Sequence, residues 1–303
     1  MDAALLSIIV TTAIIVIFLA IGINVGITLG IAGMVGITIF TGRIESGIGL
    51  PMLLSVSVTT TYSFVVIPLF VLLAAFASES QITTGLFNAA YKWMGRLPGG
   101  TAIATVITCA GMATLTGSSA ATAATMARIA LPELRRFNYD EALSVGVVTV
   151  GGTLAIMIPP SITFILYSIF AEQSIGKLLI AGILPGLVLA CLFALMVAIR
   201  CIIKPGLAPK SQVFTMREKL TSLIGVIPFL VLVLTIILGI LFGIWTPVEA
   251  AAVGVVAIFL MGLIKKEFTI KNLISGLVSS VVTSTWGFPD KTDSPELGFL
   301  TKS

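Results

Sequence analysis

The sequence predicts an all-α membrane protein, a polytopic helical bundle in which one segment forms a re-entrant helical hairpin and one transmembrane helix is broken by proline. Composition indicates this class, because 57% of the 303 residues are hydrophobic and only 10% are charged. A soluble domain carries about 25% charged residues. Several uncharged runs also reach the roughly 20 residues that a transmembrane helix needs. Together these observations exclude a soluble enzyme.

The chain contains no histidine and three cysteines, Cys109, Cys191 and Cys201. The absence of histidine excludes His-based triads, His–metal sites and histidine proton relays. The cysteines lie scattered in apolar surroundings without metal-ligand or redox spacing, so they predict neither a metal site nor a disulfide framework. Basic residues lie near the ends of apolar runs, which indicates membrane topology rather than nucleic-acid binding. We therefore expect no enzyme and no organic cofactor.

The first 40 residues are almost uncharged after Asp2. A single helix of that length would reach about 60 Å, twice the thickness of the hydrocarbon core. The run must therefore fold back, and we place the turn at 22–24. Between 79 and 97 the pattern is mixed and predicts an amphipathic segment at the membrane interface. Transmembrane spans are expected at about 5–21, 25–40, 51–78, 142–170, 178–199, 221–243 and 249–264.

Basic residues favour cytoplasmic loops and so set the orientation of these spans. The strongest cluster lies at 200–220 and is assigned to the cytoplasm, and counting spans from there puts the N-terminus outside. Segment 99–127 has basic residues on both flanks, so both flanks prefer the cytoplasm. Non-helical backbone at membrane depth is tolerated only when it is buried in protein or lines a cavity. We therefore expect 99–127 to form a re-entrant hairpin.

A run rich in glycine and hydroxyl side chains, residues 115–125, lies near the middle of that hairpin. Gly117 breaks the helix, and Ser118 or Ser119 can cap the half-helix that follows. The N-terminus of this half-helix carries a partial positive charge and free N–H groups, which suit an anionic ligand. Packing of small residues between membrane helices explains the same composition equally well.

A double proline, Pro159–Pro160, interrupts the span at 142–170. Proline cannot continue a helix and frees the carbonyl groups one turn back, which then need a cation, water or a hydroxyl as partner. Ser161 and Thr163 can cap a second half-helix. Neither broken segment contains a carboxylate, and neutral oxygens suit a monovalent cation, sodium first and potassium second. Two broken helices in succession are typical of transporter sites, and the alternative is a plain proline kink.

Thr246, Pro247 and Glu249 lie beside a span, where an acidic residue invites a functional interpretation. Their spacing matches a capping box with proline at the first helical position. We therefore interpret them as a structural helix start.

Four motifs, in order along the chain, resemble the large membrane subunit of tripartite ATP-independent periplasmic (TRAP) transporters of the C4-dicarboxylate type. They lie at 116–133, 152–162, 181–186 and 246–251, and the resemblance covers about 1–284. It implies the first half of an elevator-type ion-transporter fold and a sodium-coupled importer of small organic anions. It also implies two partners, a small four-helix membrane subunit and a soluble periplasmic binding protein, and a location in the bacterial inner membrane.

The resemblance implies site residues as well. With sodium as the coupling ion and no other metal, the first sodium site of the family is similar to Thr116, Ser119, Ala155, Ile158 and Pro159 here. Two of these depart from the family pattern, because the position of Thr116 is often serine and that of Ala155 is often glycine. Ser118 and Ser119, at the tip of the hairpin, are the expected substrate-binding residues.

Residues 285–303 form an abruptly polar tail in the middle of an expected span. Because members of the family are longer, we interpret this tail as the product of a frameshift or a truncation. We expect the chain to be inactive alone, since the second half of the transporter would be missing. Two other functions stay open, a re-entrant-loop ion channel and another kind of secondary ion transporter. A serine protease using Ser118 or Ser119 lacks a histidine or an intramembrane lysine as base.

Overall fold

The computed structural model describes residues 3–60, 65–80, 82–208, 214–265, 274, 276–278 and 280. Every element within these ranges is a helix, which confirms the predicted all-α class. The chain divides into two compact units, Met1–Phe64 and Val65–Ser303. The polar tail predicted at 285–303 lies outside the described residues.

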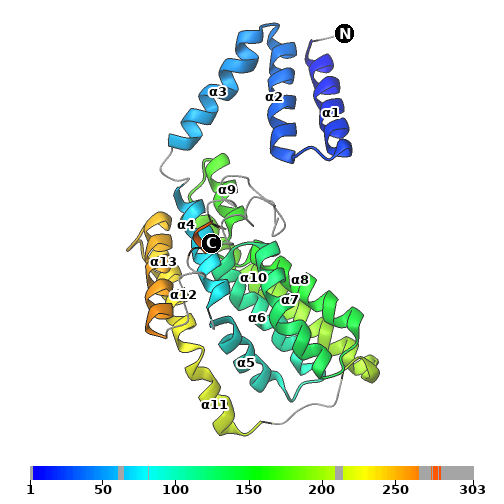
Figure 1. Cartoon of the computed structure of the whole chain (residues 1–303), viewed down its shortest axis with the longest axis vertical. Helices are drawn as coiled ribbons and strands as arrows, with labels where there is room; N and C mark the ends of the chain where they lie inside the picture. Colours follow the sequence, from blue (N-terminus) through cyan, green and yellow to red (C-terminus); the bar gives the residue numbers. More distant parts are fainter. Residues whose placement is uncertain are drawn as a thin grey trace, which may run out of the picture. The chain divides into compact units, whose positions relative to one another are not determined.

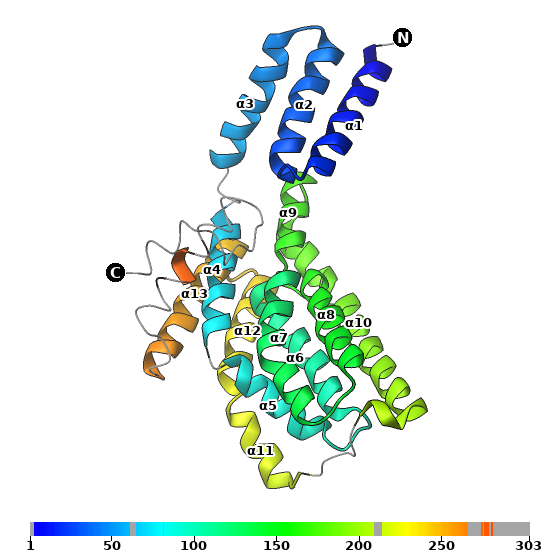
Figure 2. The same cartoon turned by 45° about the vertical axis from the view of Figure 1, so that its right-hand side comes forward.

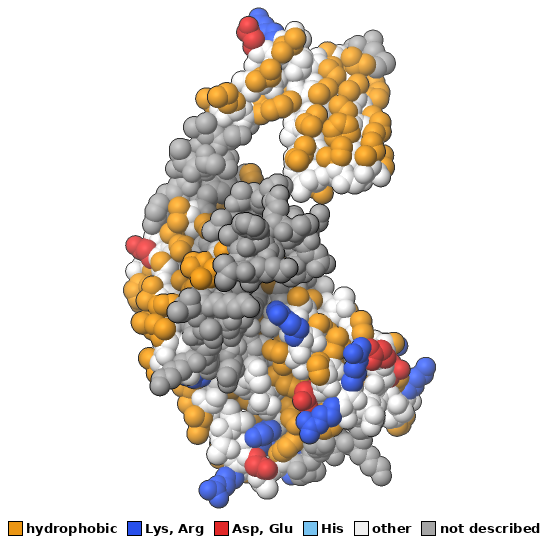
Figure 3. All heavy atoms as spheres, viewed as in Figure 1, with side chains coloured by type: hydrophobic (Ala, Val, Ile, Leu, Met, Phe, Trp, Pro, Cys, Tyr) orange, Lys and Arg blue, Asp and Glu red, His pale blue; other side chains and the backbone are white. Residues whose placement is uncertain are grey.

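The first unit consists of three apolar helices, α1 (Ala3–Ile21), α2 (Val25–Thr41) and α3 (Ile44–Thr60) (Figure 1). The Asn24 side chain accepts the N–H of Gly26 at 2.9 Å and so caps α2. α2 packs against α1 and α3, and the Ser7 hydroxyl donates to the Gly36 carbonyl at 2.8 Å. α1 buries none of its side chains within the described residues, and apolar side chains cover the visible face of this unit (Figure 3). Such a surface suits lipid or another membrane helix.

The second unit is a bundle of longer and shorter helices (Figure 2). In chain order they are α4 (Val66–Glu79), α5 (Ile82–Met94), α6 (Gly100–Thr116), α7 (Ser119–Arg136), α8 (Glu141–Met157), α9 (Ile162–Phe170), α10 (Ile175–Ile203), the short 3-10 helix η2 (Pro205–Leu207), α11 (Met216–Ile224), α12 (Ile227–Leu241) and α13 (Pro247–Ile264).

Two clusters of buried apolar side chains hold this bundle together. α4, α12 and α13 surround the first, in which Leu73 and Ile258 are fully buried. α5, α6, α7, α8 and α10 surround the second, around Met112, Met126 and Leu154. Figure 2 shows α6, α7 and α8 side by side, and each pair of these helices is in contact. The helices on both sides of the first predicted break and the helix before the second therefore pack against one another.

Four of the described helices are long and apolar enough to cross a membrane, namely α1, the joined pair α8–α9, α10 and α13. The number rises to six if the bent pairs α4–α5 and α11–α12 each form one span. α6 is apolar but has only 17 residues, which gives it a length of about 25 Å. This is shorter than the hydrocarbon core of roughly 30 Å. The chain is a multi-pass membrane protein.

Two expected spans have different helix boundaries in the structure. In the range expected as 51–78, α3 ends at Thr60 and α4 begins at Val66, with 61–64 outside the described residues. In the range expected as 221–243, the helix is divided into α11 and α12 with a bend of 54°. Pro228 stands in the first turn of α12 and has no N–H to continue α11, so the helix breaks just before it.

A close contact between two glycines packs the bend between α11 and α12 against α5. A Cβ atom on Gly85 would lie 3.1 Å from the carbonyl oxygen of Gly225, which is at the bend. At the far end of α5, the Trp93 indole N–H donates to the Lys219 carbonyl at 3.3 Å. α5 and α11 thus run together from the bend to the indole contact.

The turn before α13 is held by the capping box that the sequence predicts. The Thr246 hydroxyl accepts the Glu249 N–H at 3.3 Å, and the Glu249 carboxylate accepts the Thr246 N–H at 2.7 Å. The structural interpretation of this motif is confirmed, since the carboxylate is used in starting a helix.

Candidate functional site

The first break lies between α6 and α7. α6 ends at Thr116, and Gly117 takes a left-handed conformation with φ of +55° while its N–H donates to the Ala113 carbonyl at 3.0 Å. Ser118 then caps α7, because its hydroxyl accepts the Ala121 N–H at 3.5 Å. Of the two serines that could provide the cap, the structure assigns Ser118. Two helix ends of opposite polarity therefore meet within two residues.

The second break lies between α8 and α9. The last helical bond of α8 runs from the Ile158 N–H to the Leu154 carbonyl at 2.8 Å. Pro159 and Pro160 have no N–H, so the Ala155 and Ile156 carbonyls lack the donors that a continuous helix would provide. α9 begins at Ile162. This break leaves backbone oxygens in need of another partner at membrane depth.

The two breaks touch each other. The Ile162 N–H at the start of α9 donates to the Gly117 carbonyl at 3.2 Å. A Cβ atom on Gly117 would lie 2.8 Å from the Pro160 carbonyl oxygen and 3.1 Å from the Ile162 nitrogen. Contacts this short with backbone atoms leave space only for glycine at position 117. We call this junction of residues 116–119 and 158–162 the crossing.

A second glycine brings α7 and α8 close together beside the crossing. A Cβ atom on Gly152 would lie 2.8 Å from the Ala123 Cβ and 3.1 Å from the Ser119 carbonyl oxygen. The small side chains of the hairpin and of α8 therefore serve close helix packing. This is the close approach of helices that small residues allow in membrane proteins.

The electrostatics of the crossing come from backbone dipoles. α6 and α8 present their C-terminal, carbonyl ends, and α7 and α9 present their N-terminal, N–H ends. No charged residue occurs within 113–123 or 154–164. Carbonyl ends carry a partial negative charge that favours a cation, and N–H ends carry a partial positive charge that favours an anion. Partial charges of both signs therefore meet at the crossing without any ionised side chain.

The predicted sodium ligands lie at the crossing or in the last turn of α8. Thr116 is fully buried, and its hydroxyl donates to the Met112 carbonyl at 3.1 Å and forms a short hydrogen bond with the Thr122 hydroxyl. Ala155, Ile158 and Pro159 are buried at the end of α8, whereas Ser119 is half-buried in the first turn of α7. The hydroxyls of Thr116 and Thr122 form a buried pair that the sequence analysis did not predict.

The predicted substrate residues lie on a more open side of the crossing. Ser118 and Ser119 are half-buried, and Ala120 beside them is exposed, as is Thr163 in the first turn of α9. Ser161 is different, because it is fully buried and its hydroxyl does not cap α9. The prediction that Ser161 caps a half-helix is therefore wrong.

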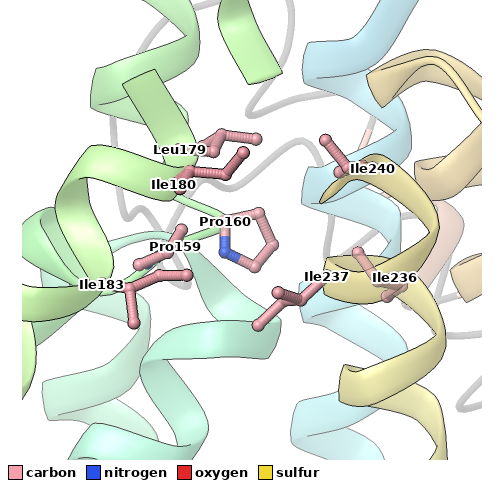
Figure 4. A pocket seen from close by; sticks show the side chains of 8 residues that line it. All are labelled: Pro159, Pro160, Leu179, Ile180, Ile183, Ile236, Ile237 and Ile240. Atoms are coloured by element: carbon pink, nitrogen blue, oxygen red, sulfur yellow. The ribbon is translucent and has the colours of Figure 1, made fainter. Parts of the chain in front are cut away.

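A pocket with only apolar side chains borders the proline break. Figure 4 shows the Pro160 ring facing Ile237 of α12 across this gap. The pocket is lined by Pro159, Pro160, Leu179, Ile180, Ile183, Ile236, Ile237 and Ile240. The side chains of this lining carry no oxygen that could coordinate an ion. The pocket lies between the proline break and α10 on one side and α12 on the other, and apolar side chains line both sides.

Comparison with known proteins identifies the family. Residues 12–286 match the family described as Tripartite ATP-independent periplasmic transporter, DctM component. The chain is 36% identical over 229 residues to the C4-dicarboxylate TRAP transporter large permease protein of Pseudomonas aeruginosa, covering 76% of this chain and 52% of that protein. It is 32% identical over 226 residues to the 2,3-diketo-L-gulonate TRAP transporter large permease protein of Escherichia coli, covering 74% and 53%.

A third relative is the ectoine TRAP transporter large permease protein of Halomonas elongata, which is 30% identical over 226 residues, with coverage of 73% and 52%. The fold and the crossing, together with these relatives, define a multi-pass membrane permease component. The chain belongs to the family of TRAP transporter large membrane subunits. The relatives are permeases and not enzymes, which confirms the prediction that no enzyme is present. The chain spans about half the length of the relatives that it matches.

Proposed function

We propose that the chain forms part of a sodium-coupled permease that imports small organic anions, C4-dicarboxylates or related carboxylates, across the bacterial inner membrane. Family membership and the C4-dicarboxylate substrate named for the Pseudomonas aeruginosa relative support the transport of a dicarboxylate. In this proposal, a periplasmic binding protein delivers the anion, and a small four-helix membrane subunit completes the membrane assembly.

The observation that carries the sodium assignment is a pair of backbone carbonyls beside the crossing that lose the donors a continuous helix would provide. The two prolines remove the N–H groups that would bond Ala155 and Ile156. These oxygens lie in the last turn of α8, close to the crossing, where α6 also ends. In the proposal Thr116, Ser119, Ala155, Ile158 and Pro159 supply neutral oxygens, which suit sodium better than a divalent ion.

The anion is assigned to the start of α7, the helix end at the crossing that carries a partial positive charge. The start of α7 combines a partial positive charge with the N–H groups of its first turn, and Ser118 and Ser119 lie there. Ala120 is exposed, so this helix end is open to a ligand larger than a sodium ion. Binding the two ligands at adjoining helix ends would couple them, because a bound cation and a bound anion attract each other.

We assign the movement of the crossing across the membrane to an elevator motion, in which α10 slides past α12 along the apolar pocket between them. The contact between α10 and α12 there consists of leucine, isoleucine and proline side chains, without directional hydrogen bonds among the pocket side chains. Dispersion contacts of this kind can be exchanged as one surface slides over another.

Sodium-dependent stability tests the sodium site in the chain itself. The 303-residue chain in lipid nanodiscs is unfolded thermally in increasing sodium chloride, with choline chloride keeping ionic strength constant. A bound ion raises the unfolding temperature by mass action. Thr116→Ala should require about tenfold more sodium for the same stabilisation, equivalent to about 1.4 kcal/mol.

Thr108→Ala is the matched control, since Thr108 is also fully buried in α6 and its hydroxyl donates to the Ala104 carbonyl at 2.7 Å. It should lower stability without changing the response to sodium. Equal sodium responses of the two variants would remove Thr116 from the site. Sodium-driven dicarboxylate uptake into proteoliposomes that contain the two partners tests transport, and unitary currents in a planar bilayer would favour a channel instead.

A further inference from the structure

Ser161 has a hydroxyl group that the fold leaves without a partner. Its side chain is fully buried, and its oxygen has no hydrogen-bond partner among the described residues. Burying a hydroxyl without a hydrogen bond costs free energy, so an orphan of this kind at membrane depth calls for an explanation. Its position inside the crossing, between Pro160 and Ile162, indicates a ligand.

Comparison with other helix starts shows that the Ser161 hydroxyl does not cap the helix that follows it. The residues before α2, α7, α8, α10, α11 and α13 all accept a backbone N–H of the following helix with the side chain. Ser161 has extended backbone angles suitable for the same role, with φ of −116° and ψ of 131°, but makes no such bond. Its oxygen therefore stays available for another partner.

The backbone groups next to Ser161 in the chain offer its hydroxyl no free N–H. The nearest N–H of α9, that of Ile162, is taken up by the Gly117 carbonyl at 3.2 Å. The carbonyl oxygen of Pro160 lies 2.8 Å from the position that a Gly117 Cβ would occupy, which places the loop around Ser161 directly against the hairpin break. The Ala155 and Ile156 carbonyls one turn earlier have lost their donors to the prolines.

Burial distinguishes the two kinds of ligand that a hydroxyl can bind. The open side of the crossing, at Ala120 and Thr163, is exposed, whereas Ser161 and Thr116 are fully buried. A dicarboxylate needs the open side, and a dehydrated monovalent ion fits among buried oxygens. We propose that the Ser161 hydroxyl oxygen is a further ligand of the sodium ion, which rests on the proposed sodium coupling.

The experiment compares Ser161→Ala with Ser168→Ala. Both serines are buried near or in α9, but the Ser168 hydroxyl donates to the Phe164 carbonyl at 2.8 Å and lies outside the crossing. In the sodium titration described above, Ser161→Ala should require about tenfold more sodium for the same stabilisation, and Ser168→Ala should match the wild-type chain. If Ser161→Ala does not fold, Ser161→Cys keeps the volume and replaces the oxygen by sulfur, a poor ligand for sodium.

A second measurement tests whether the Ser161 hydroxyl lacks a hydrogen-bond partner in the folded chain. In choline chloride without sodium, Ser161→Ala should unfold at the same temperature as the wild-type chain or a higher one, because it removes an unsatisfied group. Ser168→Ala should unfold at a lower temperature, because it removes a bond. A lower unfolding temperature of Ser161→Ala without sodium would show that its hydroxyl already has a partner, and would overturn the inference.

The outcomes also separate this inference from the function on which it rests. If Thr116→Ala weakens the sodium response and Ser161→Ala does not, Ser161 is no ligand and the sodium site stands without it. If the wild-type chain shows no response to sodium, both proposals fall. If Ser161→Ala weakens stabilisation by succinate and leaves the sodium response unchanged, the hydroxyl serves the anion and the inference is overturned.

Discussion

Gly117→Ala would test whether the crossing depends on a close approach of two backbones. The substitution adds one methyl group at a residue with φ of +55°. That methyl carbon would lie 2.8 Å from the Pro160 carbonyl oxygen and 3.1 Å from the Ile162 nitrogen. Both neighbours are backbone atoms and cannot rotate away, so the hydrogen bond between Ile162 and Gly117 must lengthen or break.

Two costs add up at this position. The left-handed conformation costs a residue with a Cβ atom about 1–2 kcal/mol. Overpacking against immobile neighbours costs about 1–3 kcal/mol more. The expected loss in the free energy of unfolding is therefore about 2–5 kcal/mol. Gly243→Ala isolates the first cost, because Gly243 has φ of +68° and nothing within 4 Å of its Cβ position.

The assay is equilibrium unfolding of both variants in mixed micelles with increasing dodecyl sulfate. Gly117→Ala should be less stable than Gly243→Ala by about 1–3 kcal/mol, the cost of overpacking alone. Equal losses for the two variants would refute the reasoning, since they would mean that the backbones at the crossing can separate without cost. A larger loss for Gly243→Ala would refute it more strongly.

Two other substitutions have outcomes set by single contacts. Tyr139→Phe removes the hydroxyl that accepts the Thr101 N–H at 3.1 Å, and should cost about 1–3 kcal/mol in the same assay because a buried donor loses its partner. Burial raises the pKa of the Tyr139 phenol, so its contribution should be complete below about pH 10 and decline as the pH rises further. Gly239→Ala would place a Cβ atom 1.5 Å from the Trp245 indole nitrogen, and should displace the ring and shift its fluorescence. Gly146→Ala, with nothing within 4 Å, should instead stabilise α8 by about 1 kcal/mol.

The sequence indicates local features of this fold well, because composition and helix-breaking residues act over short distances. Hydropathy predicts the class, and Gly117 and the two prolines mark where helices end. The division of 221–243 is missed because a hydropathy window averages over the polar α11 and the apolar α12. Pro228, which has no N–H, is the residue that would have indicated the break.

The contacts that build the candidate site are harder to predict from local sequence patterns. The hydrogen bond between Gly117 and Ile162 joins residues far apart in the chain, and no local pattern specifies which breaks will meet. The Thr116–Thr122 pair likewise depends on how the hairpin closes. Ser161 has the residue type and backbone angles of a helix cap, and only the packed structure shows that its hydroxyl makes no such bond.

The hydrogen bond that joins the two breaks also has a consequence for biosynthesis. All helices of the crossing lie between Gly100 and Phe170, so its contacts form within one continuous segment of the chain. Segments of a chain emerge from the ribosome in order, the N-terminal ones first. The crossing can therefore assemble at the translocon as soon as α9 has been synthesised. The nascent chain would form this junction of two broken helices before α10 to α13 are synthesised.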